Sequence, residues 1–156
     1  MAYRRPKSKK PSDGKKSSRL QLDFPFIIFI DENHCRNKAL LASLEEARIT
    51  YELHSDHFAR GTEDAEWIPF AGDQGWLIVT TDDNIRRRAL EKRGVLRKKV
   101  RLFVFTDNNT FGAVMAERLI SALPEMKALI EKVPPPLMAS ITKLGHVVQL
   151  WPKEKH

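Results

Sequence analysis

Cysteine is almost absent from the 156-residue chain, and because Cys35 stands alone no disulfide can form within the chain. A single cysteine suits a reducing compartment, so we expect the protein in the cytoplasm. Long apolar runs are also missing: the longest, "FPFIIFI" at 24–30, is far too short to cross a membrane. It leads into Asp31 and Glu32, where a signal peptide would have small residues. These absences argue against a disulfide-stabilised secreted domain and predict no membrane segment.

Outside its first 20 residues the chain has no net charge. The net charge of +7 comes from residues 1–20, which hold eight of the 27 Lys and Arg residues and one of the 20 acids. The rest holds 19 residues of each sign. Because the basic stretch has almost no apolar side chains to bury, we expect a disordered basic tail over 1–22 and one domain over 23–156. The tail is either an arm that binds a polyanion or a solvated leader that aids solubility.

Strand and helix patterns alternate along residues 23–156. Apolar runs predict buried strands at 26–31, 76–81 and 101–106, with a more exposed strand at 48–54 and a weaker one at 146–151. Helices are predicted at 35–47, within 61–72, at 83–93 and over 110–132, where Pro124 should split the last one in two. This order predicts an α/β fold, a three-layer α/β/α sandwich around a mainly parallel sheet of four or five strands.

Three of the predicted strands end in aspartate: Asp31 follows "FIIFI", Asp82 follows "WLIVTT" and Asp107 follows "RLFVFT". The carboxyl ends of parallel strands meet at one edge of a sheet, where open α/β sheets bind ligands, so we expect these acids to gather there. Clustered carboxylates repel one another unless a cation neutralises them, and oxygen-only sites suit Mg²⁺ or Mn²⁺. Taken singly, each aspartate also fits a helix cap. We expect Asp83 to be the cap of the helix at 83–93 and Asp82 to be the ligand.

The segments "FIIFIDEN", "GTEDAEWIPFAG" and "WLIVTTDDN", in this order and spacing, resemble the PIN-like ribonuclease domains. The similarity is greatest to the compact, VapC-related toxins of prokaryotic toxin–antitoxin modules, and it covers residues 26–109. It implies a PIN-like fold and a metal-dependent endoribonuclease, a hydrolase that cuts RNA phosphodiester bonds with Mg²⁺ or Mn²⁺. It also implies a cognate antitoxin protein as partner, and a homodimer.

The resemblance assigns roles to individual residues. The catalytic acids that hold the metal are implied to be Asp31, Asp64, Asp82 and Asp107. The residues expected to orient or support these carboxylates are Asn33, Thr80 and Asp83. Pro69 lies inside the predicted helix that carries Asp64, so the neighbouring Glu63 and Glu66 are alternatives at that position.

A basic stretch at 86–101 holds nine Lys or Arg residues and one acid. We expect it to bind the RNA backbone, because phosphate contacts dominate such binding. The residues predicted to make these contacts are Arg86, Arg87, Arg88, Arg97, Lys98 and Lys99.

Two other functions fit parts of the sequence. A receiver-like phosphoacceptor signalling domain also has an acid pair after its first strand, here Asp31 and Glu32, and a threonine after a later strand, here Thr106. Its required Lys-Pro order after the fifth strand is reversed in "LWPK". A non-catalytic RNA-binding module would need the basic stretch but not the acids. His54 and His57 are expected to be exposed polar residues, not metal ligands.

Overall fold

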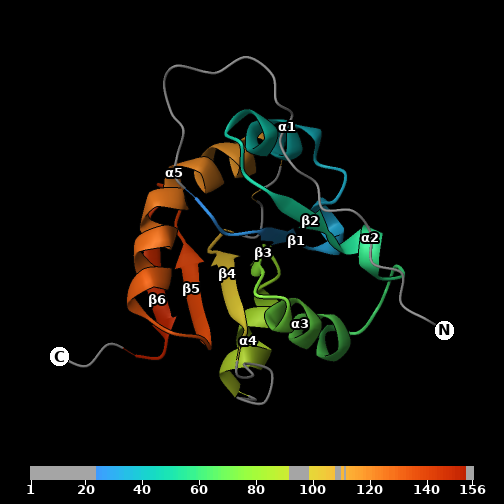
Figure 1. Ribbon diagram of the computed structural model, residues 1–156. Coiled ribbons are helices and arrows are strands. Elements are labelled where there is room, and N and C mark those ends of the chain that lie inside the picture. Colours follow the sequence, from blue (N-terminus) through green and yellow to red (C-terminus); the bar gives the residue numbers. More distant parts are fainter. Residues whose placement is uncertain (1–23, 92–98, 108–109, 111, 154–156) are drawn as a thin grey trace.

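The computed structural model describes residues 24–91, 99–107, 110 and 112–153, and the expected tail at 1–22 lies outside this part (Figure 1). Within these ranges six strands form one sheet in the order β2-β1-β3-β4-β5-β6. The first five strands are parallel, and β6 runs antiparallel to β5. Across the same ranges no helix has the length and apolarity to span a membrane.

The strands are β1 (Ile28–Ile30), β2 (Tyr51–Leu53), β3 (Leu77–Thr80), β4 (Arg101–Phe105), β5 (Leu137–Ile141) and β6 (Val147–Trp151). The helices are the 3-10 helix η1 (Glu32–His34), α1 (Lys38–Glu46), α2 (His54–His57), α3 (Asp64–Asp73), α4 (Asp83–Glu91) and α5 (Gly112–Lys132).

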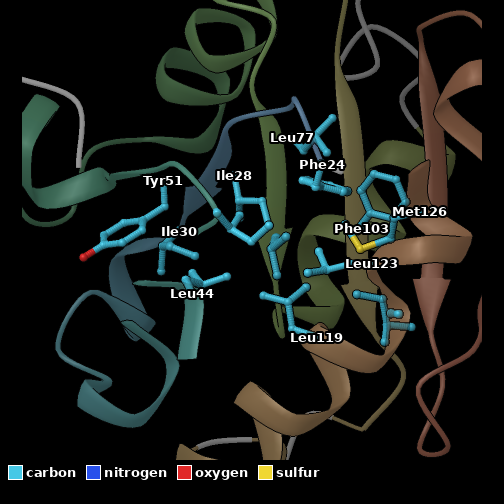
Figure 2. Close-up of a cluster of buried hydrophobic side chains, with 14 of the residues drawn as sticks. Phe24, Ile28, Ile30, Leu44, Tyr51, Leu77, Phe103, Leu119, Leu123 and Met126 are labelled. Atoms are coloured by element: carbon cyan, nitrogen blue, oxygen red, sulfur yellow. The ribbon is translucent and has the colours of Figure 1, made fainter. Parts of the chain in front are cut away.

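Helices cover both faces of the sheet, which confirms the predicted three-layer sandwich (Figure 1). One core, shown in part in Figure 2, packs α1 and α5 against Ile28, Leu77 and other strand residues. The other core packs α3 and the start of α4 against Phe29 and Ile78. Neighbouring residues of one strand therefore face opposite layers, as the strand repeat requires. Burial on both faces explains why the strands read as continuous apolar runs.

The strand order creates a topological switch point between β1 and β3, because the chain crosses from β1 to β2 on one side and returns to β3 on the other. Doubly wound sheets of this kind bind ligands at the carboxyl ends of the strands at such a point. The last residue of β1 pairs with Val79 of β3 and Leu53 of β2. The residues that follow, Asp31, Thr80 and His54, therefore start side by side along this edge.

Two features of the C-terminal half differ from the prediction. The sheet has six strands because "LMASI", after the prolines, forms β5, which the sequence pattern did not predict. The predicted split at Pro124 is wrong, since α5 is one helix with Pro124 inside it. A proline removes one backbone hydrogen bond, but Leu119, Leu123 and Met126 around it are fully buried against the sheet, and this packing holds the helix together.

The segment formed by β2 and α2 is more buried than predicted. Tyr51, Glu52 and His54 are 4%, 2% and 1% exposed. The prediction that His54 and His57 are exposed is wrong: both rings pack near Phe29, at 6.2 and 6.3 Å between ring centroids. The buried His57 Nε2 lies 2.8 Å from Glu52 Oε1. The alternating pattern of this short edge strand gave no sign that α2 packs against the aromatic side chains of α3.

Gly72 lets α3 lie close to the start of β4. A Cβ added at this position would lie 2.8 Å from Val100 Cγ2 and 3.1 Å from the Val100 nitrogen and Cα. We expect Gly72→Ala to lower the free energy of unfolding by about 1–3 kcal/mol, the usual cost of overpacking, in a denaturant titration. The exposed neighbour Asp73 offers a control, since Asp73→Ala should change the free energy of unfolding by less than about 0.5 kcal/mol. An unchanged or higher stability of Gly72→Ala would contradict the close approach.

Candidate functional site

Asp31 is the centre of the candidate site. It directly follows β1 and is 3% exposed, yet its side chain makes no capping hydrogen bond to η1, which begins after it. The Thr80 hydroxyl at the end of β3 donates a hydrogen bond to Asp31 Oδ2. Asp31 Oδ1 is buried and has no hydrogen-bond partner among the described residues. Helix capping therefore does not account for this carboxylate, and one of its oxygens stays unsatisfied.

The surroundings of Asp31 favour its neutral form when no cation is near. Burial raises the pKa of Asp31 to about 7, the hydrogen bond from Thr80 lowers it, and the charges of Asp82, Asp64 and Glu32 raise it. The charges of three acids thus act on Asp31 at the carboxyl edge of β1 and β3. A cation at this edge would reverse the balance, because it would favour the ionised carboxylate.

Thr80 connects two of these acids. It is fully buried, and besides donating to Asp31 its hydroxyl accepts a hydrogen bond from the Asp82 N–H at 3.1 Å. Val79, one residue earlier, faces the layer of α1 and α5. Because side chains alternate between the two faces of a strand, Thr80 points towards the layer of α3. One hydroxyl therefore fixes both the Asp31 carboxylate and the backbone that carries Asp82.

At the start of α4, Asp82 and Asp83 differ from the prediction. Asp82 Oδ1 accepts a hydrogen bond from Asn84 N at 2.9 Å, so Asp82 caps the helix. Asp83 instead binds Arg86 Nε at 2.7 Å and Arg87 Nε at 2.8 Å. The prediction that Asp83 is the cap is wrong, because the Asp83 side chain lies along the first turns of α4. Capping engages one Asp82 oxygen and leaves the charge of Asp82 near Asp31.

Asp64, the first residue of α3, lies at the same edge but is paired with an arginine of α4. Arg88 Nη2 donates to Asp64 Oδ2 at 2.5 Å, and Trp67 Nε1 donates to Asp64 Oδ1 at 3.1 Å. The alternatives for this helix, Glu63 and Glu66, are exposed. Of these three acids, Asp64 is the one whose charge acts on Asp31.

Asp107 lies apart from the other acids. Its strand, β4, is separated from β1 by β3, which places the two strand ends about 10 Å apart. Asp107 Oδ2 lies 3.6 Å from Arg118 Nη1, on α5 in the layer opposite α3, and Asp107 is not among the acids that shift the pKa of Asp31. The acids that the fold brings together are Asp31, Asp64, Asp82 and Glu32, and Glu32 was not among the predicted metal ligands. As the side chains stand in the described residues, no three His, Cys, Asp or Glu groups are placed to hold a metal ion.

His34 is a neighbour of the site that the sequence did not reveal. It is 7% exposed, its Nε2 forms a hydrogen bond with Thr81 Oγ1 at 2.7 Å, and the same atom lies 3.9 Å from Asp31 Oδ1. Burial lowers the pKa of His34 while the pKa of Asp31 is raised, so this close pair joins two groups that both favour their neutral forms. The available signal was its position three residues after Asp31, which one 3-10 turn brings back towards that residue.

Two hollows flank the acids. One, of about 390 Å³, is lined by Asn33, Asp82 and Arg87 among others. The second, of about 440 Å³, lies towards β2 and is lined by Asn33 and Glu32 among others. Asn33, predicted to orient the carboxylates, is exposed and lines both hollows.

Of the predicted RNA contacts, Arg87 lines the first hollow, whereas Lys99 precedes β4 and so lies at the amino ends of the parallel strands, the edge opposite Asp31. On α4, Arg87 and Arg88 are exposed and Arg86 is half-buried. Lys99 is exposed just before β4. Arg97 and Lys98 lie outside the described residues.

The chain is similar to one protein family and to one curated protein. The family described as "PIN like domain" matches residues 26–107, just over half of the chain. "Putative ribonuclease VapC45" of Mycobacterium tuberculosis is 33% identical over 72 residues, 46% of this chain and 52% of that protein. The chain thus spans about half the length of the curated relative that it matches. No solved structure matches it significantly.

The raised pKa of Asp31 predicts how stability depends on pH in metal-free buffer. The folded state keeps the Asp31 proton up to about pH 7, whereas the unfolded state loses it near pH 4. The contribution of Asp31 to stability should therefore be greatest at or below pH 4 and should fall on the order of 4 kcal/mol as the pH rises to about 7. Asp31→Asn should remove that fall and make the metal-free protein more stable at pH 8, as measured by denaturant unfolding at several pH values.

The exposed Asp73 provides a matched control, since Asp73→Asn makes the same chemical change away from the site and should leave the pH profile as it is. A clear loss of metal-free stability in Asp31→Asn at pH 8 would mean that Asp31 is a structural residue.

Proposed function

The chain belongs to the PIN-like domain family, and from this premise we propose that it is a metal-dependent endoribonuclease and the toxin of a toxin–antitoxin module. The observation that supports the chemistry best is the buried carboxylate of Asp31. Its Oδ1 has no hydrogen-bond partner among the described residues, and it lies at the switch point of the sheet among three other acids. Such an arrangement is costly without a cation, which suggests that a cation belongs there.

The residues present fit a hard divalent cation. All of the side-chain donors proposed are carboxylate oxygens, which suit Mg²⁺ or Mn²⁺. Asp31, Asp64 and Asp82 would hold the ion, and Asp107 would join them only if it separated from Arg118. The ligands do not converge as they stand, because Arg88 already neutralises Asp64 and without a cation like charges favour separation. When bound, an ion of this class lowers the pKa of a water and neutralises charge that develops on a phosphodiester.

The residues of the chain prepare the site for this reaction. Thr80 holds one oxygen of Asp31 and leaves the other towards the acidic edge. We propose that Arg87, Arg88 and Lys99 bind the RNA backbone, together with Arg97 and Lys98. Arg86 and Arg87 each bind Asp83 through Nε, and a guanidinium has further N–H donors for phosphate oxygens. Asp83 would thereby support these arginines instead of binding the ion.

An antitoxin partner follows from the proposed toxin role. We propose that an antitoxin segment covers the acidic edge and places an arginine on a carboxylate, because a guanidinium binds carboxylates through two donors. Within the chain, Arg88 already pairs with Asp64 at this edge, through one donor, Nη2. We also propose that the protein acts in the cytoplasm, where its RNA substrate is, and a homodimer stays a prediction.

The alternative functions have less support. A receiver-like domain shares the strand order 2-1-3-4-5, so the order of the strands does not separate the two. The residue that would take the place of its lysine after β5, Lys143, is exposed in the turn that leads to β6. A non-catalytic RNA-binding module would not need a buried, unsatisfied carboxylate.

The proposed activity is tested by incubating the full chain with single-stranded RNA in EDTA, and then with Mg²⁺ or Mn²⁺ in excess. We expect cleavage only with the metal, and a loss of at least about 100-fold in Asp31→Asn and Asp82→Asn, because each removes a ligand charge. Asp73→Asn is the control and should cleave normally. Cleavage that persists in EDTA, or full activity in Asp31→Asn, would overturn the proposal.

Arg88 should compete with the metal for Asp64. In Arg88→Gln the carboxylate no longer has its cationic partner, so we expect Mn²⁺ to bind roughly 2- to 5-fold more tightly, the range set by a part-exposed ion pair. Arg87→Gln removes an equal charge one residue earlier on α4 and should leave the Mn²⁺ affinity closer to that of the parent protein. Isothermal titration of both variants measures this. A weaker affinity in Arg88→Gln would show that Asp64 is not a ligand.

The basic tail at 1–22 is proposed to be an RNA-binding arm separate from the chemistry. A chain that begins at Leu20 should bind RNA more weakly, with a log–log salt dependence reduced by about 1–3, since each phosphate contact contributes about 0.7. The single-turnover rate at saturating RNA should stay the same, because the arm binds ground and transition states alike. An unchanged salt slope would make the tail a passive leader.

A further inference from the structure

The hollow of about 440 Å³ beside the acids, named here the β1–β2 cavity, has no role in the chemistry proposed above. It is lined by residues that follow β1, among them Glu32 and Arg36, and by residues of α2 and the segment after it, among them His54, Phe58 and Arg60. Its volume lies in the range of small-molecule sites, about 300–1,000 Å³. The cavity opens at the same sheet edge as Asp31, because the register starts Asp31 and His54 side by side.

His54 gives this cavity an unsatisfied polar wall. The residue is 1% exposed, and neither ring nitrogen has a hydrogen-bond partner among the described residues. Burial lowers the pKa of His54, so its neutral ring has one donor and one acceptor. Its ring centroid lies 5.4 Å from that of Phe58, with the rings tilted, and 5.4 Å from that of Trp67, with the rings edge to face. Leaving two such atoms unpaired is unfavourable, and a ligand with its own donor and acceptor would offset the cost.

The cavity also has an aromatic side chain, Phe58, and two cations, Arg36 and Arg60. Phe58 is half-buried and lines the cavity, and both arginines are exposed. Glu32 Oε1 accepts a hydrogen bond from Gly61 N at 2.7 Å, which ties the loop after Phe58 to η1. The cavity thus combines an aromatic face, neutral polar groups and two cations next to a carboxylate site.

We propose that the β1–β2 cavity binds one nucleotide of a single-stranded RNA substrate, with its base against Phe58 and its phosphates near Arg36 and Arg60. This inference rests on the proposed ribonuclease function and adds a subsite to it. Single-stranded nucleic acids are bound by aromatic side chains on which bases stack, within grooves of positive charge. The phosphodiester at Asp31 would then lie between this cavity and the hollow beside Arg87, so one strand could contact both.

The combination of groups favours a nucleotide over a simple anion. Glu32 and the acids beyond it repel a free anion, whereas a base is neutral and brings its phosphates within reach of the arginines. A neutral histidine matches the donor and acceptor groups of a base edge better than the oxygens of a phosphate.

The test is a scan with abasic RNA. The full chain in EDTA, where the proposed reaction is stopped, is titrated with a set of short single-stranded RNAs that each lack the base at one position. Fluorescence anisotropy reports the affinity of each. We expect the loss of one base, at a position next to the bond that is cut with Mn²⁺, to weaken binding roughly 5- to 150-fold, the effect of one stacked base.

Phe58→Leu keeps an apolar side chain and removes the aromatic face. It should weaken binding to intact RNA and remove the abasic effect at that one position. Phe70→Leu is the matched control: Phe70 packs 5.2 Å from Phe58 between ring centroids but does not line the cavity, so its abasic pattern should be that of the parent. Thermal unfolding of both variants checks that they are folded.

The arginines are tested through the salt dependence. Arg36→Gln and Arg60→Gln should each lower the log–log slope by about 0.7, and Lys38→Gln, an exposed cation outside the cavity, should not. His54→Phe keeps the ring and should level any preference among the four bases at the mapped position.

A flat abasic scan, or an abasic effect that persists in Phe58→Leu, would overturn the subsite. If RNA is cleaved with Mn²⁺ in either case, the ribonuclease proposal stands without the subsite. If RNA neither binds in EDTA nor is cleaved with metal, both proposals fail.

Discussion

The candidate site depends on one buried carboxylate that is only half satisfied. Asp31 directly follows β1. Thr80 of β3 donates a hydrogen bond to one of its oxygens, and the other has no hydrogen-bond partner in the described residues. Burial and three neighbouring acids raise its pKa to about 7. Such a group destabilises a fold unless something compensates for it. Its presence at the switch point of a doubly wound sheet is the physical reason to look for a cation there.

The rest of the fold controls how this charge is balanced. Parallel strands bring the ends of β1 and β3 together, while the first residue of α3, Asp64, and the cap of α4, Asp82, lie at the same edge. Arg88 on α4 neutralises Asp64, and the amide of Asn84 engages one oxygen of Asp82. These partners stabilise the separated acids. They also set what a metal ion would have to displace or share in order to bind.

Much of the fold followed from the sequence because continuous apolar runs and helical repeats are local properties. The runs before Asp31, Asp82 and Asp107 correctly marked three parallel strands. Where tertiary packing decides, the local pattern failed: Pro124 stays inside α5, and "LMASI" forms β5.

The candidate site was predictable only in part for the same reason. Strand order put Asp31 and Thr80 together, as the sequence suggested. The distance of Asp107 from the other acids depends on β3 lying between β1 and β4, and its pairing with Arg118 depends on where α5 packs. The burial of His34 and His54 likewise comes from chain turns with no sequence motif. Cap identity at Asp82 or Asp83 depends on a one-residue difference in where α4 begins.

The most direct measurement of the central claim is a crystal structure of the protein soaked in Mn²⁺, with the metal located by its anomalous scattering. We expect a peak about 2.1 Å from the Asp31 Oδ1 atom, the distance expected for a small hard cation, with Asp82 also in its coordination sphere. We also expect Asp64 to turn from Arg88 towards the ion. A structure without a peak at Asp31, or with Mn²⁺ bound only elsewhere, would contradict it.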